Sequence, residues 1–208
     1  MNAQEKQSQD STLYVKVKGD TLFTDALQLD EVFLFNKLSF SSSKDKMAYY
    51  ILRRKTYKVY PYAKIAADRL VGLRDTLSFI KGKRKQKRYT KKVQKYIEGE
   101  FSARLKKMTR TEGQILVKLV HRQTGETAFD LVKELRTGWR AFWYNTTASF
   151  FDISLKEEYQ PNLVHEDYLI EDVLQRAFAD GALQRQDSKL SFNYADLSNK
   201  WYSQDKKK

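Results

Sequence analysis

A single basic segment, Lys83–Met108 (KRKQKRYTKKVQKYIEGEFSARLKKM), indicates that this chain is built largely from long helices. Its apolar residues follow one another at intervals of 4, 3, 1, 4, 4 and 3 positions, which places all of them on one face of a helix. These residues are Tyr89, Val93, Tyr96, Ile97, Phe101, Leu105 and Met108. Arg88, Lys91, Lys92 and Lys95 fall on other faces, so they must be solvated or bound to a partner.

A second helical pattern precedes this segment and runs from Lys44 to about Ile80. Pro61 lies in its middle, where a proline removes one backbone donor and clashes with the preceding turn. We therefore expect either two helices that meet at Pro61 or one kinked helix. Gly82 separates this pattern from the basic segment.

Helix signals continue after the basic segment. Thr109-x-x-Glu112 is a capping box for a helix from Gly113 to about Arg122, which Gly125 ends. Thr127-x-x-Asp130 caps a further helix that is expected to reach Phe151, and the aromatic residues in it predict the centre of the core. These are Trp139, Phe142, Trp143, Phe150 and Phe151. The last predicted helix covers His165–Ala179, with Gly181 as its stop.

The two ends of the chain show the alternation typical of strands. Leu13–Val17 alternates, Gly19-Asp20 can turn the chain into a hairpin, and Glu31–Phe35 is rich in strand formers, so we expect a small β-meander ending near Phe40. Residues 183–208 alternate at Leu190, Phe192 and Tyr194, which is compatible with one added strand. The final Lys206–Lys208 is expected to be disordered.

Together these patterns predict a mainly α protein, α+β by strict counting. One helical domain of four to five helices, residues 13–182, would carry the N-terminal β-meander, between a disordered segment at 1–12 and a C-terminal tail at 183–208. The chain of 208 residues contains 12 Phe and 13 Tyr but only 8 Gly and 2 Pro, which favours long helices around a sizeable core.

The net charge of +13 implies attraction to a negative partner, and nine of the fifteen residues in Lys81–Lys95 are Lys or Arg. The candidate residues for binding this partner are Lys83, Arg84, Lys85, Lys87, Arg88, Lys91, Lys92 and Lys95. The partner could be an anionic membrane surface, a glycolipid, an acidic envelope protein or nucleic acid, and a merely solvated helix face remains the alternative. Base stacking is disfavoured because Tyr89 and Tyr96 lie on the stripe predicted to be buried.

The sequence predicts no catalytic residue, metal site or cofactor. The absence of Cys excludes thiolate chemistry, and His121 and His165 lack the spacing of metal ligands. Adjacent carboxylates such as Glu171-Asp172 point about 100° apart on a helix and are better explained as partners of lysines. The tyrosines around Pro61 (Tyr57, Tyr60 and Tyr62) form a candidate groove for a sugar or a peptide.

The sequence also bears on location. It has no run of 18 or more apolar residues, so no transmembrane segment is predicted. The start Met1-Asn2-Ala3-Gln4 is typical of the remnant of a removed signal peptide behind an added Met, although an ordinary disordered N-terminus would look the same.

Several motifs carry a family resemblance over roughly Leu13–Gln160. They are Leu29-Asp30-Glu31-Val32, Val59-Tyr60-Pro61-Tyr62-Ala63, the stretch from Gly113 to Leu119 (GQILVKL) and Arg122-x-Thr124-Gly125-x-Thr127. In these the chain resembles a domain-of-unknown-function family of exported Bacteroidota proteins. The resemblance implies export to the periplasm or cell envelope, and it brings no activity, cofactor or catalytic residue.

We therefore expect a non-enzymatic periplasmic or envelope-associated protein that binds or scaffolds an anionic partner through its basic helix face. One alternative is a nucleic-acid-binding module that uses the same face. The other is an enzyme of unrecognised type that acts on an envelope glycan.

Overall fold

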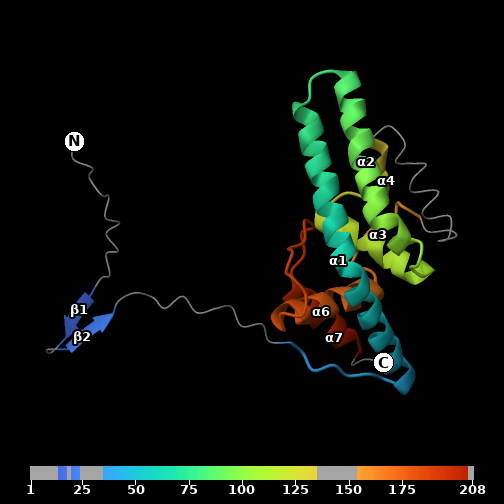
Figure 1. The fold of residues 1–208 in the computed structure, drawn as a ribbon. Helices are drawn as coiled ribbons and strands as arrows, with labels where there is room; N and C mark the ends of the chain where they lie inside the picture. The colour runs from blue at the N-terminus through green and yellow to red at the C-terminus, as the bar shows by residue number, and fades with distance from the viewer. Residues whose placement is uncertain (1–13, 18–19, 24–34, 135–153, 206–208) are drawn as a thin grey trace, which may run out of the picture. The chain divides into compact units, whose positions relative to one another are not determined.

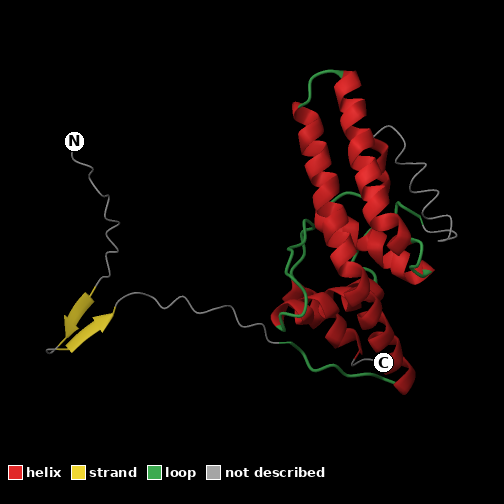
Figure 2. Cartoon of the chain, in the orientation of Figure 1, coloured by secondary structure: helices red, strands yellow, loops and turns green. Residues whose placement is uncertain are grey.

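The computed structural model describes residues 14–17, 20–23, 35–134 and 154–205, and it divides into two units, residues 1–34 and 35–208. The second unit is helical (Figures 1 and 2), which confirms the expected mainly helical class. Its helices are α1 (Ser43–Phe79), α2 (Lys83–Leu105), α3 (Arg110–Thr124), α4 (Ala128–Glu134), α6 (His165–Ala179) and α7 (Tyr194–Asp205).

The described part of the first unit is an antiparallel pair of strands, β1 (Tyr14–Val17) and β2 (Asp20–Phe23). Tyr14 lies opposite Phe23 and Val17 opposite Asp20. Residues 24–34, where the rest of the expected meander falls, lie outside the described residues, and residues 35–42 contain no strand. The three-stranded meander therefore stays a prediction.

Helix α1 runs for 37 residues with Pro61 inside it, so the structure has one continuous helix where the sequence left a junction open. It begins at a conventional cap, since the side chain of Ser42 accepts a hydrogen bond from the backbone N–H of Asp45 at 3.1 Å. Pro61 is exposed, whereas Val59, Tyr60 and Ala63 around it are buried. Packing of this inner face holds the helix together where the ring removes a hydrogen bond on the solvent side.

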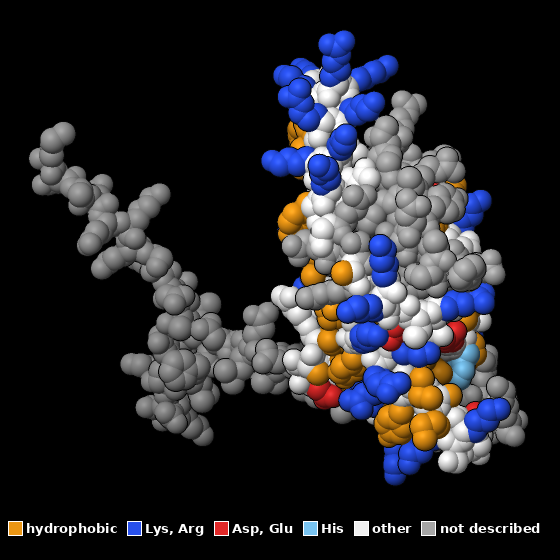
Figure 3. Space-filling model, turned by 45° about the vertical axis from the view of Figure 1, so that its right-hand side comes forward, with side chains coloured by type: hydrophobic (Ala, Val, Ile, Leu, Met, Phe, Trp, Pro, Cys, Tyr) orange, Lys and Arg blue, Asp and Glu red, His pale blue; other side chains and the backbone are white. Residues whose placement is uncertain are grey.

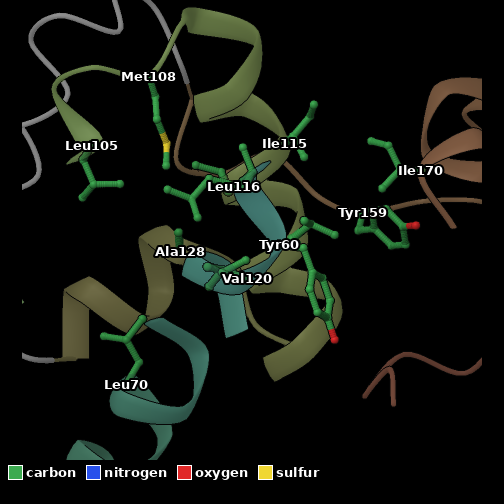
Figure 4. Close-up of a cluster of buried hydrophobic side chains, with 14 of the residues drawn as sticks. Tyr60, Leu70, Leu105, Met108, Ile115, Leu116, Val120, Ala128, Tyr159 and Ile170 are labelled. Atoms are coloured by element: carbon green, nitrogen blue, oxygen red, sulfur yellow. The ribbon is translucent and has the colours of Figure 1, made fainter. Parts of the chain in front are cut away.

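The core lies where α1, α3 and α6 meet. Val59, Ala63, Leu119, Ile170 and Leu174 are fully buried there. Figure 4 shows part of this cluster: side chains of α3 lie in the middle of the view, Leu70 of α1 lies at the lower left, and Tyr60 of α1 lies toward Tyr159 and Ile170 at the right. Burial of aliphatic and aromatic side chains of this kind is the main stabilising contribution to a helical domain.

The caps predicted for α3 are present. Thr109 Oγ1 accepts the backbone N–H of Glu112, and Glu112 Oε2 accepts the backbone N–H of Thr109 at 2.8 Å, which is a complete capping box. The helix begins at Arg110, three residues earlier than expected, and ends at Gly125, whose φ of 77° lies in the left-handed region that glycine favours. The expected extension of α4 to Phe151 and the aromatic cluster of Trp139–Phe151 lie outside the described residues.

The described residues 183–205 contain no strand at Leu190–Tyr194, and the segment that the sequence suggested as a tail contains helix α7. Asn193 Oδ1 accepts the backbone N–H of Ala195 at 2.7 Å and starts α7. Leu190 and Phe192 alternate because they pack in an extended segment against the core, and Trp201 Nε1 of α7 donates to the carbonyl of Pro161 at 2.9 Å. Lys206–Lys208 lies outside the described residues.

Candidate functional site

Helices α1 and α2 form an antiparallel hairpin (Figure 1). Hydrogen bonds hold its turn, residues 80–82. Gly82 adopts a φ of 101°, and its carbonyl accepts the backbone N–H groups of Lys85 and Gln86 at 3.0 and 3.1 Å. Gln86 Nε2 donates to the carbonyl oxygens of Ile80 at 3.0 Å and Leu77 at 3.3 Å. One side chain of α2 thus caps the C-terminal end of α1. We call residues 79–95, which comprise the last residue of α1, the turn and the first half of α2, the hairpin tip.

All eight cations predicted to bind a partner are exposed on α2, and Figure 3 shows Lys and Arg gathered at the upper end of the molecule, over this hairpin. At about 100° per residue, they span roughly 200° of the helix circumference. The opposite side packs inward, since Thr90 is buried and Tyr89 and Val93 are partly buried against the core. Of the predicted stripe, Tyr89, Val93, Leu105 and Met108 thus lie on the inward side, Tyr96 is exposed, and the side chains of Ile97 and Phe101 lie outside the described residues.

This arrangement opposes the stability of α2 itself. The first turn contains no acidic residue, so the cations there lie at the positive end of the helix dipole. Five like-charged pairs stand at the i,i+4 spacing that brings side chains together, and each destabilises a helix slightly. They are Lys83/Lys87, Lys87/Lys91, Lys91/Lys95, Arg84/Arg88 and Arg88/Lys92.

Six cations elsewhere in the described chain form ion pairs with acids. Lys58 Nζ lies 2.8 Å from Glu112, Lys118 Nζ lies 2.6 Å from Asp167, and Arg74 pairs with Glu126. None of the eight tip cations forms an ion pair with a described residue. The hairpin tip is thus the place where positive charge is concentrated without a counter-charge.

The most deeply buried of these ion pairs lies between α3 and α6. Arg122 donates to Glu171 from both Nε (2.7 Å) and the NH2 nitrogen (2.9 Å), and the two side chains are 1% and 0% exposed. Tyr159 and Gln175 also donate to Glu171, each at 2.8 Å. Burial alone would raise the pKa of Glu171, but the charge of Arg122 and these hydrogen bonds hold it below its ordinary value.

Sequence reasoning missed these pairs. It assigned Glu171 and Asp172 to lysines, whereas their partners are Arg122 and Arg176. The signal was available in the spacing: Lys118 and Arg122 are four residues apart on α3, and Asp167 and Glu171 are four apart on α6. Two such pairs on facing helices can form parallel ion pairs, but only the packing of α3 against α6 shows that they do.

A pocket of about 770 Å³ lies between the N-terminal half of α1, helix α6 and residues 36–41. Asp172, which lines this pocket, accepts hydrogen bonds from Tyr49 (3.0 Å), Tyr194 (2.6 Å) and Arg176 Nε (2.9 Å). Burial and the Asp172 charge raise the pKa of Tyr49 and of Tyr194. This arrangement is that of a structural network, because its polar atoms face one another.

The tyrosines of the candidate groove do not act together. Tyr60 is 1% exposed, and its hydroxyl donates to the carbonyl of Gln184 at 2.9 Å; burial raises its pKa to about 12. Tyr62 is half-buried against the core, and Tyr57 lies half-buried beside Arg53. None of the three lines the pocket. Tyr60 is a core residue because it lies on the inward face of α1, so a ligand has no access to it.

Both histidines contact other side chains or the backbone within the fold. His121 Nδ1 accepts the backbone N–H of Tyr159 at 2.8 Å, and burial lowers the pKa of His121 although Glu158 and Asp167 act in the opposite direction. The ring of His165 packs at a tilt against Trp201, with centroids 4.9 Å apart, and stacks on Tyr168. The described residues contain no cluster of three or more His, Asp or Glu side chains placed to hold a metal ion.

Among the helices that the structure describes, none has the length and apolar composition needed to cross a membrane.

The chain was compared with protein families, curated proteins and solved structures. No curated protein and no solved structure is similar enough to the chain to be matched. The family described as "Domain of unknown function (DUF4294)" matches residues 20–176, which include α1, α2, α3 and most of α6 and therefore reach beyond the expected limit at Gln160. The chain belongs to this domain-of-unknown-function family.

Proposed function

We propose that this chain is a binding protein of the cell envelope that attaches to an anionic partner through the hairpin tip. One observation carries the proposal: eight exposed cations are concentrated on α2 in an arrangement that weakens the helix and has no counter-charge among the described residues. Natural proteins commonly give up stability where a site needs a particular charge, so such an unfavourable cluster favours a role in binding over a merely solvated face.

A binding role also agrees with the interior. Each buried charged group described above is used by another protein group: Arg122 by Glu171, Lys118 by Asp167, and Asp172 by Arg176 and two tyrosines. Groups held in this way fix the fold and are poorly suited to exchange protons with a substrate. The hairpin tip, in contrast, presents charges that a partner can neutralise.

The envelope location rests on the sequence. The motifs described above resemble those of exported Bacteroidota proteins, and this resemblance supports an envelope location. In that compartment the available anionic partners are lipid headgroups, glycolipids and acidic proteins.

Nucleic acid is a second candidate partner, because Tyr96 is exposed and not buried as the spacing predicts. Tyr96, assigned to the buried stripe, is 51% exposed, and the Arg69 guanidinium lies over its ring at 5.4 Å. An exposed aromatic ring beside a basic helix is a suitable stacking platform for a base.

Two matched variants test the proposal. The tip variant carries Lys83→Glu, Arg84→Glu, Lys91→Glu and Lys92→Glu, which turns all five like-charged i,i+4 pairs into Lys/Arg–Glu pairs. The distal variant carries Lys44→Glu, Lys46→Glu, Arg54→Glu and Lys189→Glu, all exposed and away from the hairpin tip. Both change the net charge equally.

The measurement is fractionation of cells that make the wild-type protein or either variant. We expect the wild type and the distal variant to remain with the envelope and to be released by salt, and the tip variant to be released without it. If both variants stayed with the envelope as the wild type does, the proposal would be wrong. Recovery of the wild type with cytosolic nucleic acid would favour the second candidate instead.

A further inference from the structure

The end of α1 holds an apolar side chain in water beside the cations. Phe79 is 83% exposed, the highest exposure among the large apolar residues that the structure describes as exposed. It is followed within a few residues by Lys81, Lys83 and Arg84, all exposed. A single exposed aromatic residue needs no explanation by itself, but one surrounded by unmatched cations at the end of a helical hairpin combines two recognition elements.

The turn next to Phe79 is well ordered, so its exposure is a property of the fold. The side chain of Gln86 holds the carbonyl oxygens of Leu77 and Ile80, on either side of Phe79, and Gly82 closes the turn in a left-handed conformation. Thr90 Oγ1 in turn donates to the carbonyl of Gln86 at 3.0 Å. These hydrogen bonds fix the backbone that directs Phe79 outward.

We propose that the hairpin tip docks on an anionic lipid bilayer, with Phe79 inserted at the level of the headgroups. This inference rests on the proposed function and names its partner. Lys and Arg near an anionic surface each add to the attraction, and their long side chains let the charges stay at the headgroups while an aromatic ring enters more deeply. Basic residues combined with an apolar anchor are the recurrent elements of peripheral membrane binding.

The shape of the site favours a bilayer over a polynucleotide. The eight cations are distributed over roughly 200° of the helix circumference, so they surround the tip rather than line one groove. A nucleic-acid strand is usually followed by a groove of cations with several stacking residues. A projecting end with one apolar residue at its apex suits insertion into a flat surface.

The test uses the full chain and sedimentation with vesicles. The vesicles contain phosphatidylcholine alone or phosphatidylcholine with phosphatidylglycerol, and heparin serves as a soluble polyanion without an apolar phase. We expect binding to the vesicles with phosphatidylglycerol and to heparin, and none to pure phosphatidylcholine. Phe79→Ser should weaken vesicle binding about tenfold and leave heparin binding unchanged, since only the bilayer can bury the ring. Phe79→Leu should retain most of the vesicle binding.

Each other outcome has a definite meaning. If heparin binds but vesicles do not, or if Phe79→Ser sediments like the wild type, the bilayer inference is wrong and the proposed function stands. If neither heparin nor vesicles bind, the proposed function fails as well. If a single-stranded RNA binds more tightly than vesicles and Phe79→Ser weakens that binding, the ring stacks on bases and the bilayer inference is wrong. Circular dichroism checks that both variants keep their helix content.

Discussion

Arg122 of α3 and Glu171 of α6 form a two-point ion pair with both side chains withdrawn from water, at 2.7 and 2.9 Å. Arg122 also donates to the carbonyl of Gln186 at 3.0 Å, and the backbone N–H of Lys189 donates to the carbonyl of Arg122 at 2.9 Å. One residue of α3 therefore fixes both α6 and the segment that leads to α7. This pair is the centre of the scaffold from which the α1–α2 hairpin extends.

Breaking the pair from one side should be far more harmful than removing it altogether. Arg122→Met or Glu171→Leu alone leaves a buried charge without its counter-charge and should lower the free energy of unfolding by about 3–5 kcal/mol. The double variant should lose much less than the sum of the two. Urea denaturation of all four proteins gives the coupling energy, and additive losses would show that the pair is not coupled.

His121 should make stability depend on pH near neutrality. Its folded-state pKa lies below the ordinary value of 6.5, chiefly through burial, so the unfolded chain binds the proton more readily. Its contribution is complete above pH 6.5 and is lost as the pH falls through the folded pKa. In His121→Asn, the side-chain oxygen can accept the N–H of Tyr159 in place of Nδ1, but it cannot titrate.

The measurement is urea denaturation of the wild type and His121→Asn between pH 7.5 and 5, a range chosen to span about one unit or more on each side of the ordinary pKa of His. The wild type should lose stability more steeply toward acid pH than the variant. If the free energy of unfolding fell equally with pH in both proteins, the pH dependence would not come from protonation of His121.

Pro61 should be a weak point of α1. The residue is exposed, so replacing it removes little packing, and alanine restores the N–H that a continuous helix would donate to the carbonyl of Tyr57. We expect Pro61→Ala to raise the free energy of unfolding by up to about 3 kcal/mol. Thermal unfolding checks this, and a lower melting temperature would mean that the ring itself supports the packing of α1.

The tip variant should be more stable than the wild type. It converts five repulsive i,i+4 pairs into attractive ones and places two Glu residues in the first turn of α2, for an expected gain of about 1–3 kcal/mol at low salt. The gain should shrink as salt screens the charges. A loss of stability in urea denaturation at low salt would show that the cations support the fold, contrary to our account.

Local signals in the sequence predicted much of this fold. The bounds of α6, the capping box of α3 and the glycines that end α3 and α6 all depend on neighbours within a few residues, and all are confirmed. Spacing also predicted the inward position of Tyr89, Val93, Leu105 and Met108, but not that of Tyr96, which lies near the edge of the stripe and is half exposed.

The remainder depended on contacts between distant segments. The alternation at Leu190–Tyr194 is the same for a strand and for an extended segment packed on a core, and only Asn193 signalled the start of α7. The closeness of Tyr57, Tyr60 and Tyr62 in the sequence suggests a shared groove, but on a helix they occupy different faces, and Tyr60 lies on the buried one. The exposure of Phe79 could not be predicted, because the sequence at the end of a helix does not show whether another segment covers that residue.

The most direct test of the central claim is the affinity of the chain for heparin over a series of salt concentrations, with the tip and distal variants beside the wild type. The account predicts that the wild type and the distal variant bind and that their affinity falls steeply with salt, because bound counterions are released. The tip variant, with the same net charge as the distal variant, should bind at least about tenfold more weakly, since it loses several cation contacts together. Equal affinity of the two variants would show that only overall charge matters and would contradict a binding site at the hairpin tip.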